Sequence, residues 1–495
     1  MGIEQGGLMV NAEHSWSQGG PSSPGFVQQP APGTEPDRRH ESPQLDELVD
    51  SADEYASGGG LDVLDARPGP WRAYLRALGP GLVTGASDDD PSGIATYAQT
   101  GAQFGFGMLW VALITLPLMA GVQEICDRTA LATGKGLGEL SAACFGRAWR
   151  GVIGTLIAAL IVANTLNIAA DLVAVGAGMH LLHAGPGAVW AVVVGSVIIV
   201  LLVNGSFVTI ARVFKVLCVA LVAYVVVLFA VKVPWGTVGL DTVAPHIEWT
   251  RSYIALIIAV LGTTISPYLF FWQSMHRIED MREEPAGGKR PLPLPRRSPK
   301  EAAGKLSTSR FDVFLGMTFS NLVMFAIIVA TATTLSDHGR HLELTSAAQA
   351  ASALRPVAGR FATTVFACGF IGSGFLAIPV LAGAGSAGMA GLLGKPTGFS
   401  RSPRRAPVFY CLCAVGTLGG MALSLLSVNP VQLLVFVAVV NGLAAAPFIV
   451  VVMVVSSTRS LMGEYSNGKL ALFLGWATAA LMAGTTVALL ATGGV

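Results

Sequence analysis

The chain has 495 residues, of which 52% are hydrophobic and 12% are charged, and its mean hydropathy is +0.61. This composition excludes an ordinary soluble domain and predicts an all-α protein with many membrane-spanning helices. The formal net charge of +1 identifies no partner, because charge in such a chain is distributed by membrane side. Six cysteines without CxxC spacing predict neither a disulfide framework nor a zinc site.

The first segment, residues 1–68, is rich in Gly, Ser, Pro and Glu and carries an acidic stretch at 46–54. Such a segment cannot bury enough apolar area to order itself. It also lacks the basic and apolar regions of a signal peptide. We predict a disordered cytoplasmic tail over 1–68, followed by a transmembrane domain over 69–495.

Apolar runs long enough to cross a bilayer recur from residue 79 to the end of the chain. A helix of about 17–25 residues is needed for one crossing, and about eleven runs meet that length. The predicted spans are 79–100, 104–126, 150–181, 186–204, 212–233, 250–276, 311–335, 358–393, 406–426, 430–456 and 470–492.

Lysine and arginine gather after the even-numbered spans, and the loop at 277–310 is the most basic. Because basic loops stay on the cytoplasmic side, we predict a multi-pass plasma-membrane protein with a cytoplasmic N-terminus and an outside C-terminus. The same rule accounts for the basic loop, so we expect the lipid bilayer and no nucleic acid as a partner.

Two predicted spans are broken near their midpoints by proline beside small and polar residues, at Pro91 within 81–100 and at Pro267 within 254–273. Proline ends the preceding helical turn, and freed backbone groups in hydrocarbon are tolerated only where they line a cavity or bind something. The breaks fall in spans one and six, which start on opposite sides. This predicts two inverted five-helix repeats plus one extra helix, as in the neurotransmitter:sodium symporter fold. The repeats cover about 77–233 and about 250–456, and the extra helix covers 470–492.

Asp90 stands directly before Pro91 in the centre of the first span. A charged carboxylate there costs about 2.5–3.5 kcal/mol unless it faces a cavity, a partner or an ion. With freed carbonyls and hydroxyls it forms an oxygen set that suits Mg²⁺, Ca²⁺ or Mn²⁺, and it can also cap the second half-helix. Asp88 and Asp89 point elsewhere, either to the outer mouth of an ion path or into solvent.

Five stretches resemble, in order, the Nramp family of divalent metal transporters. They are 86–110, 128–134, 167–179, 372–388 and 439–477. The resemblance covers about residues 70–490 and implies the inverted-repeat fold and movement of a divalent cation by alternating access. The metal ion is then a substrate, with no cofactor. No HExxH or GxSxG set is present in the sequence, so we expect no enzyme activity.

The resemblance places Asp90 at the metal-binding aspartate of the family motif Asp-Pro-Gly-Asn. Ser92 and Gly93 then occupy the positions of the family's glycine and asparagine. We expect Asp90 to be the principal ligand, with the carbonyl near Ser87 and the hydroxyl of Ser92 completing or hydrating the shell.

In the sixth span the family has Ala-x-x-Met-Pro-His, where the methionine sulfur contacts the metal. Here Thr263, Ser266 and Tyr268 stand at the alanine, methionine and histidine positions, and a second family histidine falls at Gln273. Sulfur and imidazole favour softer metals, whereas oxygen suits hard ions. We therefore expect these residues to form an oxygen-only half of the site. In lacking the methionine the chain resembles a Nramp-related branch of magnesium transporters.

Proton coupling in the family uses an aspartate and a glutamate three residues apart in the third helix, with the sixth-helix histidine nearby. This chain has Asp171 but Ala174. Asp171 is a relay candidate, with a bond to Asn167 or Thr165 as the alternative role. We predict weak or absent coupling.

The sequence thus predicts a transporter that imports Mg²⁺ and/or Mn²⁺, with no obligate protein partner evident. One alternative is a proton-coupled Mn²⁺/Fe²⁺ symporter of ordinary Nramp type. A second is a sodium-coupled amino-acid symporter on the same fold, which is disfavoured because Asp90 would repel a substrate carboxylate.

Overall fold

The structure is a computed structural model in which every regular element among the described residues is helical. It describes residues 80–204, 221–222, 224–226, 228–229, 232–245, 247–284, 290–335, 343–344, 346–352, 362–426 and 429–492. The predicted tail at 1–68 and most of the predicted span at 212–233 lie outside these ranges.

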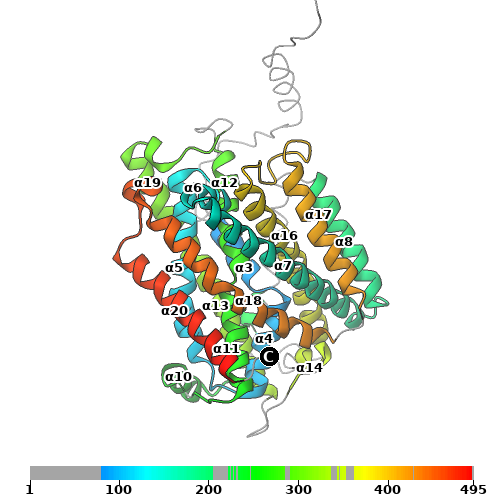
Figure 1. Ribbon diagram of the computed structural model, residues 1–495. Coiled ribbons are helices and arrows are strands. Elements are labelled where there is room, and N and C mark those ends of the chain that lie inside the picture. Colours follow the sequence, from blue (N-terminus) through cyan, green and yellow to red (C-terminus); the bar gives the residue numbers. More distant parts are fainter. Residues whose placement is uncertain are drawn as a thin grey trace, which may run out of the picture. The chain divides into compact units, whose positions relative to one another are not determined.

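Nine helices in the described part of the chain are long and apolar enough to cross a membrane, counting the broken segment Arg251–Arg282 as one. A second broken segment supplies the first predicted span. The helices of the membrane region are α3 (Pro80–Asp88), α4 (Pro91–Phe104), α5 (Trp110–Thr133), α7 (Arg147–Leu181), α8 (Gly187–Asn204), α11 (Arg251–Thr264), α12 (Pro267–Arg282), α13 (Pro299–Leu335), α16 (Ala362–Leu392), α17 (Pro407–Ser424), α18 (Pro430–Ser457) and α20 (Lys469–Ala491) (Figure 1). Shorter helices connect them: α6 (Leu137–Cys144), α10 (Trp235–Val243), η2 (Leu294–Arg296), α14 (Ala347–Ser352), α19 (Arg459–Met462) and η4 (Gly463–Tyr465).

Helices that are five spans apart in the sequence pack against each other. The third span, α7, packs on the eighth, α16, and α5 packs on α13. In the same way α8 contacts α17, α3 contacts α12, and α4 contacts α11. A pseudo-two-fold axis that relates two inverted repeats produces this pairing of counterparts. The predicted inverted-repeat fold is confirmed, with α20 as the extra helix.

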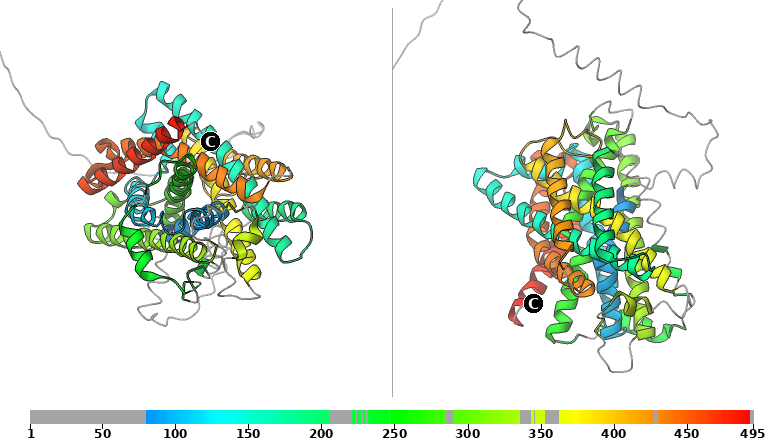
Figure 2. Two further views of the ribbon diagram at one scale, coloured as in Figure 1. Left: turned by 90° about the horizontal axis from the view of Figure 1, so that it is seen from below. Right: turned by 90° about the vertical axis from the view of Figure 1, so that its right-hand side faces the viewer.

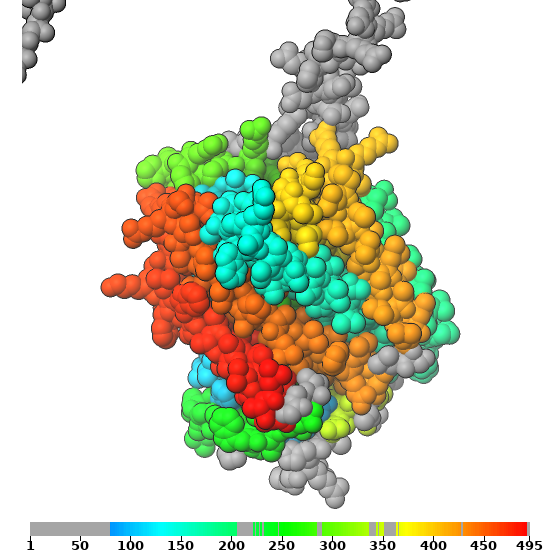
Figure 3. Space-filling model, in the orientation of Figure 1, coloured from blue at the N-terminus to red at the C-terminus, as the bar shows by residue number. Residues whose placement is uncertain are grey.

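The broken helices lie in the centre of the bundle, and other helices surround them. In the segment formed by α11 and α12, 89% of the apolar window is buried, against 28% in α8 and 22% in α20. Figure 2 (left) shows α4 and α11 enclosed by the other helices, and Figure 3 shows α7 and α20 on the surface. Because the exposed side chains of α8 and α20 are largely apolar, we infer that these helices face lipid.

Both predicted breaks are confirmed, and each falls beside its proline. Pro91 and Pro267 are the first residues of α4 and α12, a position where the missing N–H costs no hydrogen bond. On the other side of the first break, α3 lies directly on α13, since a Cβ atom on Gly85 would overlap the backbone of Gly316. Beyond the break, α4 packs on α13 as well, since a Cβ atom on Gly101 would overlap the backbone of Ile328, so α13 supports both halves of the first span.

Candidate functional site

Asp90 lies in the gap between α3 and α4, and its side chain is 1% exposed. Its Oδ1 atom accepts hydrogen bonds from Ser92 Oγ at 2.6 Å and from Gly93 N at 2.7 Å. The expected capping role is confirmed, because Asp90 is the N-cap of α4. One carboxylate oxygen is thus occupied by the chain's own donors.

The second oxygen of Asp90 points towards the other broken helix. Its closest donor there is the Tyr268 hydroxyl, 3.4 Å from Oδ2 and also 3.4 Å from the carbonyl oxygen of Ser87. Hydrogen bonds of this length are weak, so Oδ2 keeps most of its capacity as a ligand. The structure therefore brings Asp90, Ser87 and Tyr268 together around one point between the two breaks.

Thr263 and Ser266 reach this region from the end of α11. The Ser266 hydroxyl donates to the carbonyl oxygens of Gly262 at 2.6 Å and of Thr263 at 2.9 Å, which leaves its lone pairs available. The Thr263 hydroxyl is 1% exposed and has no hydrogen-bond partner among the described residues. Both side chains present neutral oxygen.

Gly93 of α4 and Thr263 of α11 lie against each other across the two broken helices. A Cβ atom on Gly93 would lie 3.0 Å from Thr263 Oγ1 and 3.3 Å from the Asp88 carbonyl oxygen. A residue with a side chain at position 93 therefore crowds the threonine. We infer that the two departures from the family motif, Gly93 and Thr263, partly compensate each other in volume.

Of the two roles considered for Asp88 and Asp89, the solvated one is wrong in this structure, and a place at the outer mouth of an ion path stays a prediction. Both side chains are fully buried, and both accept hydrogen bonds from Ser320 of α13, at 2.7 Å and 3.3 Å respectively. Nothing in the sequence around residue 89 indicates this partner, which lies more than 200 residues away.

Asp171 lies on α7 and is fully buried. Neither of its oxygens has a hydrogen-bond partner within the ranges that the structure describes, and the same holds for the side chains of Asn167 and Asn441. Thr165 donates to the Ile161 carbonyl instead. The alternative role, a bond from Asp171 to Asn167 or Thr165, is therefore not formed.

The described residues contain no group of three or more His, Cys, Asp or Glu side chains placed to hold a metal ion. Near the Oδ2 atom of Asp90 the described groups are neutral oxygens, the Tyr268 hydroxyl and the Ser87 carbonyl. An oxygen set with a single carboxylate carries less charge than a metal centre with several carboxylates.

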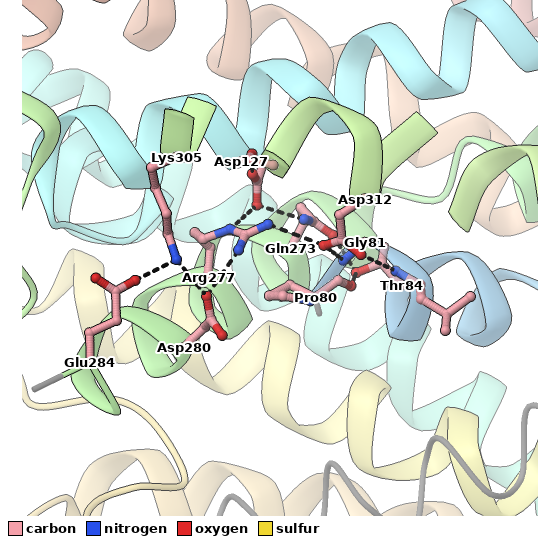
Figure 4. A network of polar contacts seen from close by, with 12 residues as sticks. Pro80, Gly81, Thr84, Asp127, Gln273, Arg277, Asp280, Glu284, Lys305 and Asp312 are labelled. Carbon is pink, nitrogen blue, oxygen red and sulfur yellow. Dashed lines mark hydrogen bonds and ion pairs between the residues drawn. The ribbon is translucent and has the colours of Figure 1, made fainter. Parts of the chain in front are cut away.

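A second buried polar network begins close to the site and was not anticipated (Figure 4). Arg277 was expected to begin the basic loop, but it lies within α12 and is 4% exposed. Its guanidinium contacts Asp127 at 2.7 Å, Asp280 at 3.0 Å and Asp312 at 3.3 Å. The three carboxylates come from α5, α12 and α13, so one cation joins three helices.

The same network holds the first turn of α3. Asp312 accepts hydrogen bonds from the backbone N–H groups of Gly81 at 2.8 Å and Leu82 at 3.3 Å. Gln273 donates to Asp127 at 2.7 Å and is hydrogen-bonded to Thr84 of α3. Gln273, at the family's second histidine position, therefore belongs to this network rather than to the ligands around Asp90.

Comparison with known proteins identifies the family. Residues 81–492 match the profile of the family described as natural resistance-associated macrophage protein-like, or Nramp. The chain belongs to the Nramp family. This Nramp chain is 27% identical, over 88% of its length and 93% of the relative's, to a protein of Verminephrobacter eiseniae named divalent metal cation transporter MntH. It is 26% identical to the protein of that name in Mycobacterium leprae, over 83% of its own length and 91% of the relative's.

Solved structures share the fold of this Nramp protein. A manganese transporter of Eremococcus coleocola superposes with a TM-score of 0.65 at 16% identity and covers 87% of this chain and 88% of its own. A nucleobase-cation-symport-1 family transporter in a closed conformation superposes with a TM-score of 0.53 at 15% identity, over 84% of this chain and 91% of its own. Both comparisons support the inverted-repeat architecture derived from the helix pairing.

Proposed function

We propose that this Nramp protein imports a divalent metal cation, Mg²⁺ and/or Mn²⁺, across the plasma membrane by alternating access, with weak or absent proton coupling. The N-terminus is cytoplasmic and the C-terminus lies outside. The observation that carries the proposal is the Oδ2 atom of Asp90, a buried carboxylate oxygen between two helix breaks whose closest donor is 3.4 Å away.

The groups around this oxygen support a hard ion. Tyr268, Thr263 and Ser266 contribute hydroxyls, and Ser87 contributes a carbonyl, where the family motif has a thioether and an imidazole. Mg²⁺ dehydrates reluctantly and keeps several waters when it is bound by one or two carboxylates. We propose that the ion binds Asp90 directly and that the other groups contact its remaining waters.

For any proton transport that accompanies the metal ion, Asp171 is the proposed proton acceptor. It is buried on α7 and has no hydrogen-bond partner among the described residues, but Ala174 replaces the family's glutamate. With this link missing, transport runs downhill under the membrane potential, which supplies about 4.6 kcal/mol per 100 mV for a divalent ion.

Alternating access requires each end of the path to open in turn. In this structure Asp90 and the other proposed ligands are buried, and the Arg277 network fixes the start of α3 at the end of the bundle that carries the basic loops. We propose that opening towards the cytoplasm separates α3 from Asp312 and Gln273.

A second candidate function is a proton-coupled Mn²⁺ symporter. It is favoured by the relatives, since one is named a divalent metal cation transporter and a structural neighbour is a manganese transporter. Competition separates the two candidates. If Mg²⁺ at millimolar concentration displaces Mn²⁺ from the purified protein, the oxygen-ligand proposal holds. If Mn²⁺ stays bound, the oxygen-ligand argument for Mg²⁺ is wrong, and acidification of the lumen during Mn²⁺ uptake then decides for the second candidate.

A further inference from the structure

A groove of about 770 Å³ opens between α5, α13 and α20, away from the Asp90 site. Its volume lies within the range of about 300–1,000 Å³ that is typical of sites for small ligands. Most of its lining comes from helices of the membrane region and is apolar, so we infer that its open side faces the bilayer. It is lined by Pro117, Ala120, Gly121, Glu124, Arg128, Leu306, Arg310, Val313, Phe314, Glu464, Tyr465, Ser466, Gly468, Lys469, Leu470, Ala471 and Leu474.

The groove is charged at one end and apolar along its length. On α5 the lining changes from Glu124 to Pro117, about 10 Å along the helix axis. On α13 it changes from Arg310 to Phe314, and on α20 from Lys469 to Leu474. All three helices thus place their charged residue at the same end. This arrangement matches an amphiphile with one polar head and an apolar chain.

The charged end has a net positive charge, because Arg128, Arg310 and Lys469 stand against the two carboxylates Glu124 and Glu464, and this favours an anionic head. Glu124 is already neutralised, because it contacts both Arg128 and Arg310 at 3.0 Å. Arg310 is 56% exposed, and Lys469 is exposed and forms no ion pair with any residue that the structure describes. Lys469 also begins α20, whose first-turn N–H groups receive no side-chain cap and favour negative charge.

We propose that this groove binds an anionic phospholipid of the cytoplasmic leaflet, with its phosphate between Arg310 and Lys469 and one acyl chain along Phe314 and Ala471. Basic pockets between membrane helices on the cytoplasmic side are sites for such headgroups. The bound lipid would fill the space between α20 and the paired helices α5 and α13. It would lie beside the turn of α13 that carries Asp312.

The test compares lipids on the purified full-length protein. Phosphatidylglycerol is titrated by native mass spectrometry and by thermal unfolding, with phosphatidylcholine of the same acyl chains as reference. We expect phosphatidylglycerol to bind and stabilise the protein selectively. In the variant Arg310→Gln/Lys469→Gln its affinity falls about 30-fold, the equivalent of about 2 kcal/mol for two basic residues. The control Lys300→Gln/Arg404→Gln removes the same charge from exposed positions outside the groove and keeps the preference.

Two further results would overturn the proposal. Ala471→Phe fills the apolar part without changing charge, so unchanged phosphatidylglycerol binding would show that the lipid does not enter the groove. A photoreactive phenylalanine analogue at Phe314 should acquire the mass of a phospholipid in membranes. Its attachment to a peptide from residues 1–79 would show instead that the chain's own N-terminal segment occupies the groove.

Discussion

The hydrogen bonds from the first turn of α3 to Asp312 lead to a quantitative prediction. Asp312→Asn keeps one acceptor, which turns the charge-assisted bond from Gly81 into an ordinary one, and its NH2 group leaves the Leu82 N–H without an acceptor, a loss of about 1 kcal/mol each. It also removes one of the three carboxylates that contact Arg277. Together these losses reach about 3 kcal/mol, near the low end of the cost of breaking a buried ion pair. If this contact closes the cytoplasmic end, the variant opens that end about 100-fold more often.

The assay is the rate at which a thiol reagent modifies a cysteine introduced at Ala86, a fully buried position on α3, in a background without the native cysteines. Lys305→Gln is the matched control. It breaks only the outer ion pairs with Asp280 and Glu284, which are partly exposed, so its effect should stay below about fivefold. An unchanged rate in Asp312→Asn, or an equal rise in the control, would refute the assignment of the network as a closure.

The remaining predictions concern the ligands. Asp90→Asn retains the N-cap but loses the charge, so saturable uptake should vanish while thermal unfolding changes little; uptake with unaltered affinity would remove Asp90 from the site. Gly93→Asn should destabilise the protein by about 1–3 kcal/mol through overpacking. In a double-mutant cycle, adding Thr263→Ala should recover most of that loss, and strictly additive effects would contradict the volume compensation. Ser266→Met should raise the preference for Mn²⁺ over Mg²⁺ in competition binding, and Ser266→Leu should not; equal behaviour of the two would show that sulfur is irrelevant here.

The helix breaks were predictable because their cause is local. Pro91 and Pro267 cannot continue the preceding helix, and Asp90 beside the first proline is a favoured cap. The length of each apolar run likewise sets a span without reference to the rest of the chain. Such features depend only on neighbouring residues, so they can be predicted from a short stretch of sequence.

The networks were not predictable because their partners are remote. Ser320 meets Asp88 across more than 200 residues, and no local pattern indicates it. A signal did exist for the second network. Asp127, Arg277 and Asp312 all stand within two residues of the predicted ends of spans on the same membrane side, with opposite charges. Charged residues at such places favour pairing over exposure to solvent.

The compensation between Gly93 and Thr263 was hidden for a different reason. Each residue departs from the family motif. Considered alone, each substitution changes only the chemistry of the proposed metal ligands. Their contact, with Thr263 Oγ1 3.0 Å from a Cβ on Gly93, appears only when α4 and α11 are placed side by side. Packing volume is a property of the pair and cannot be read from either position alone.

The most direct test of the proposed function is uptake into proteoliposomes of Mg²⁺ and of Mn²⁺, with the internal pH recorded at the same time. We predict saturable Mg²⁺ uptake that follows an inside-negative potential and leaves the internal pH unchanged. Uptake of Mn²⁺ that excludes Mg²⁺ and acidifies the lumen would contradict the proposal, and would show that the oxygen ligands around Asp90 support ordinary proton-coupled manganese transport.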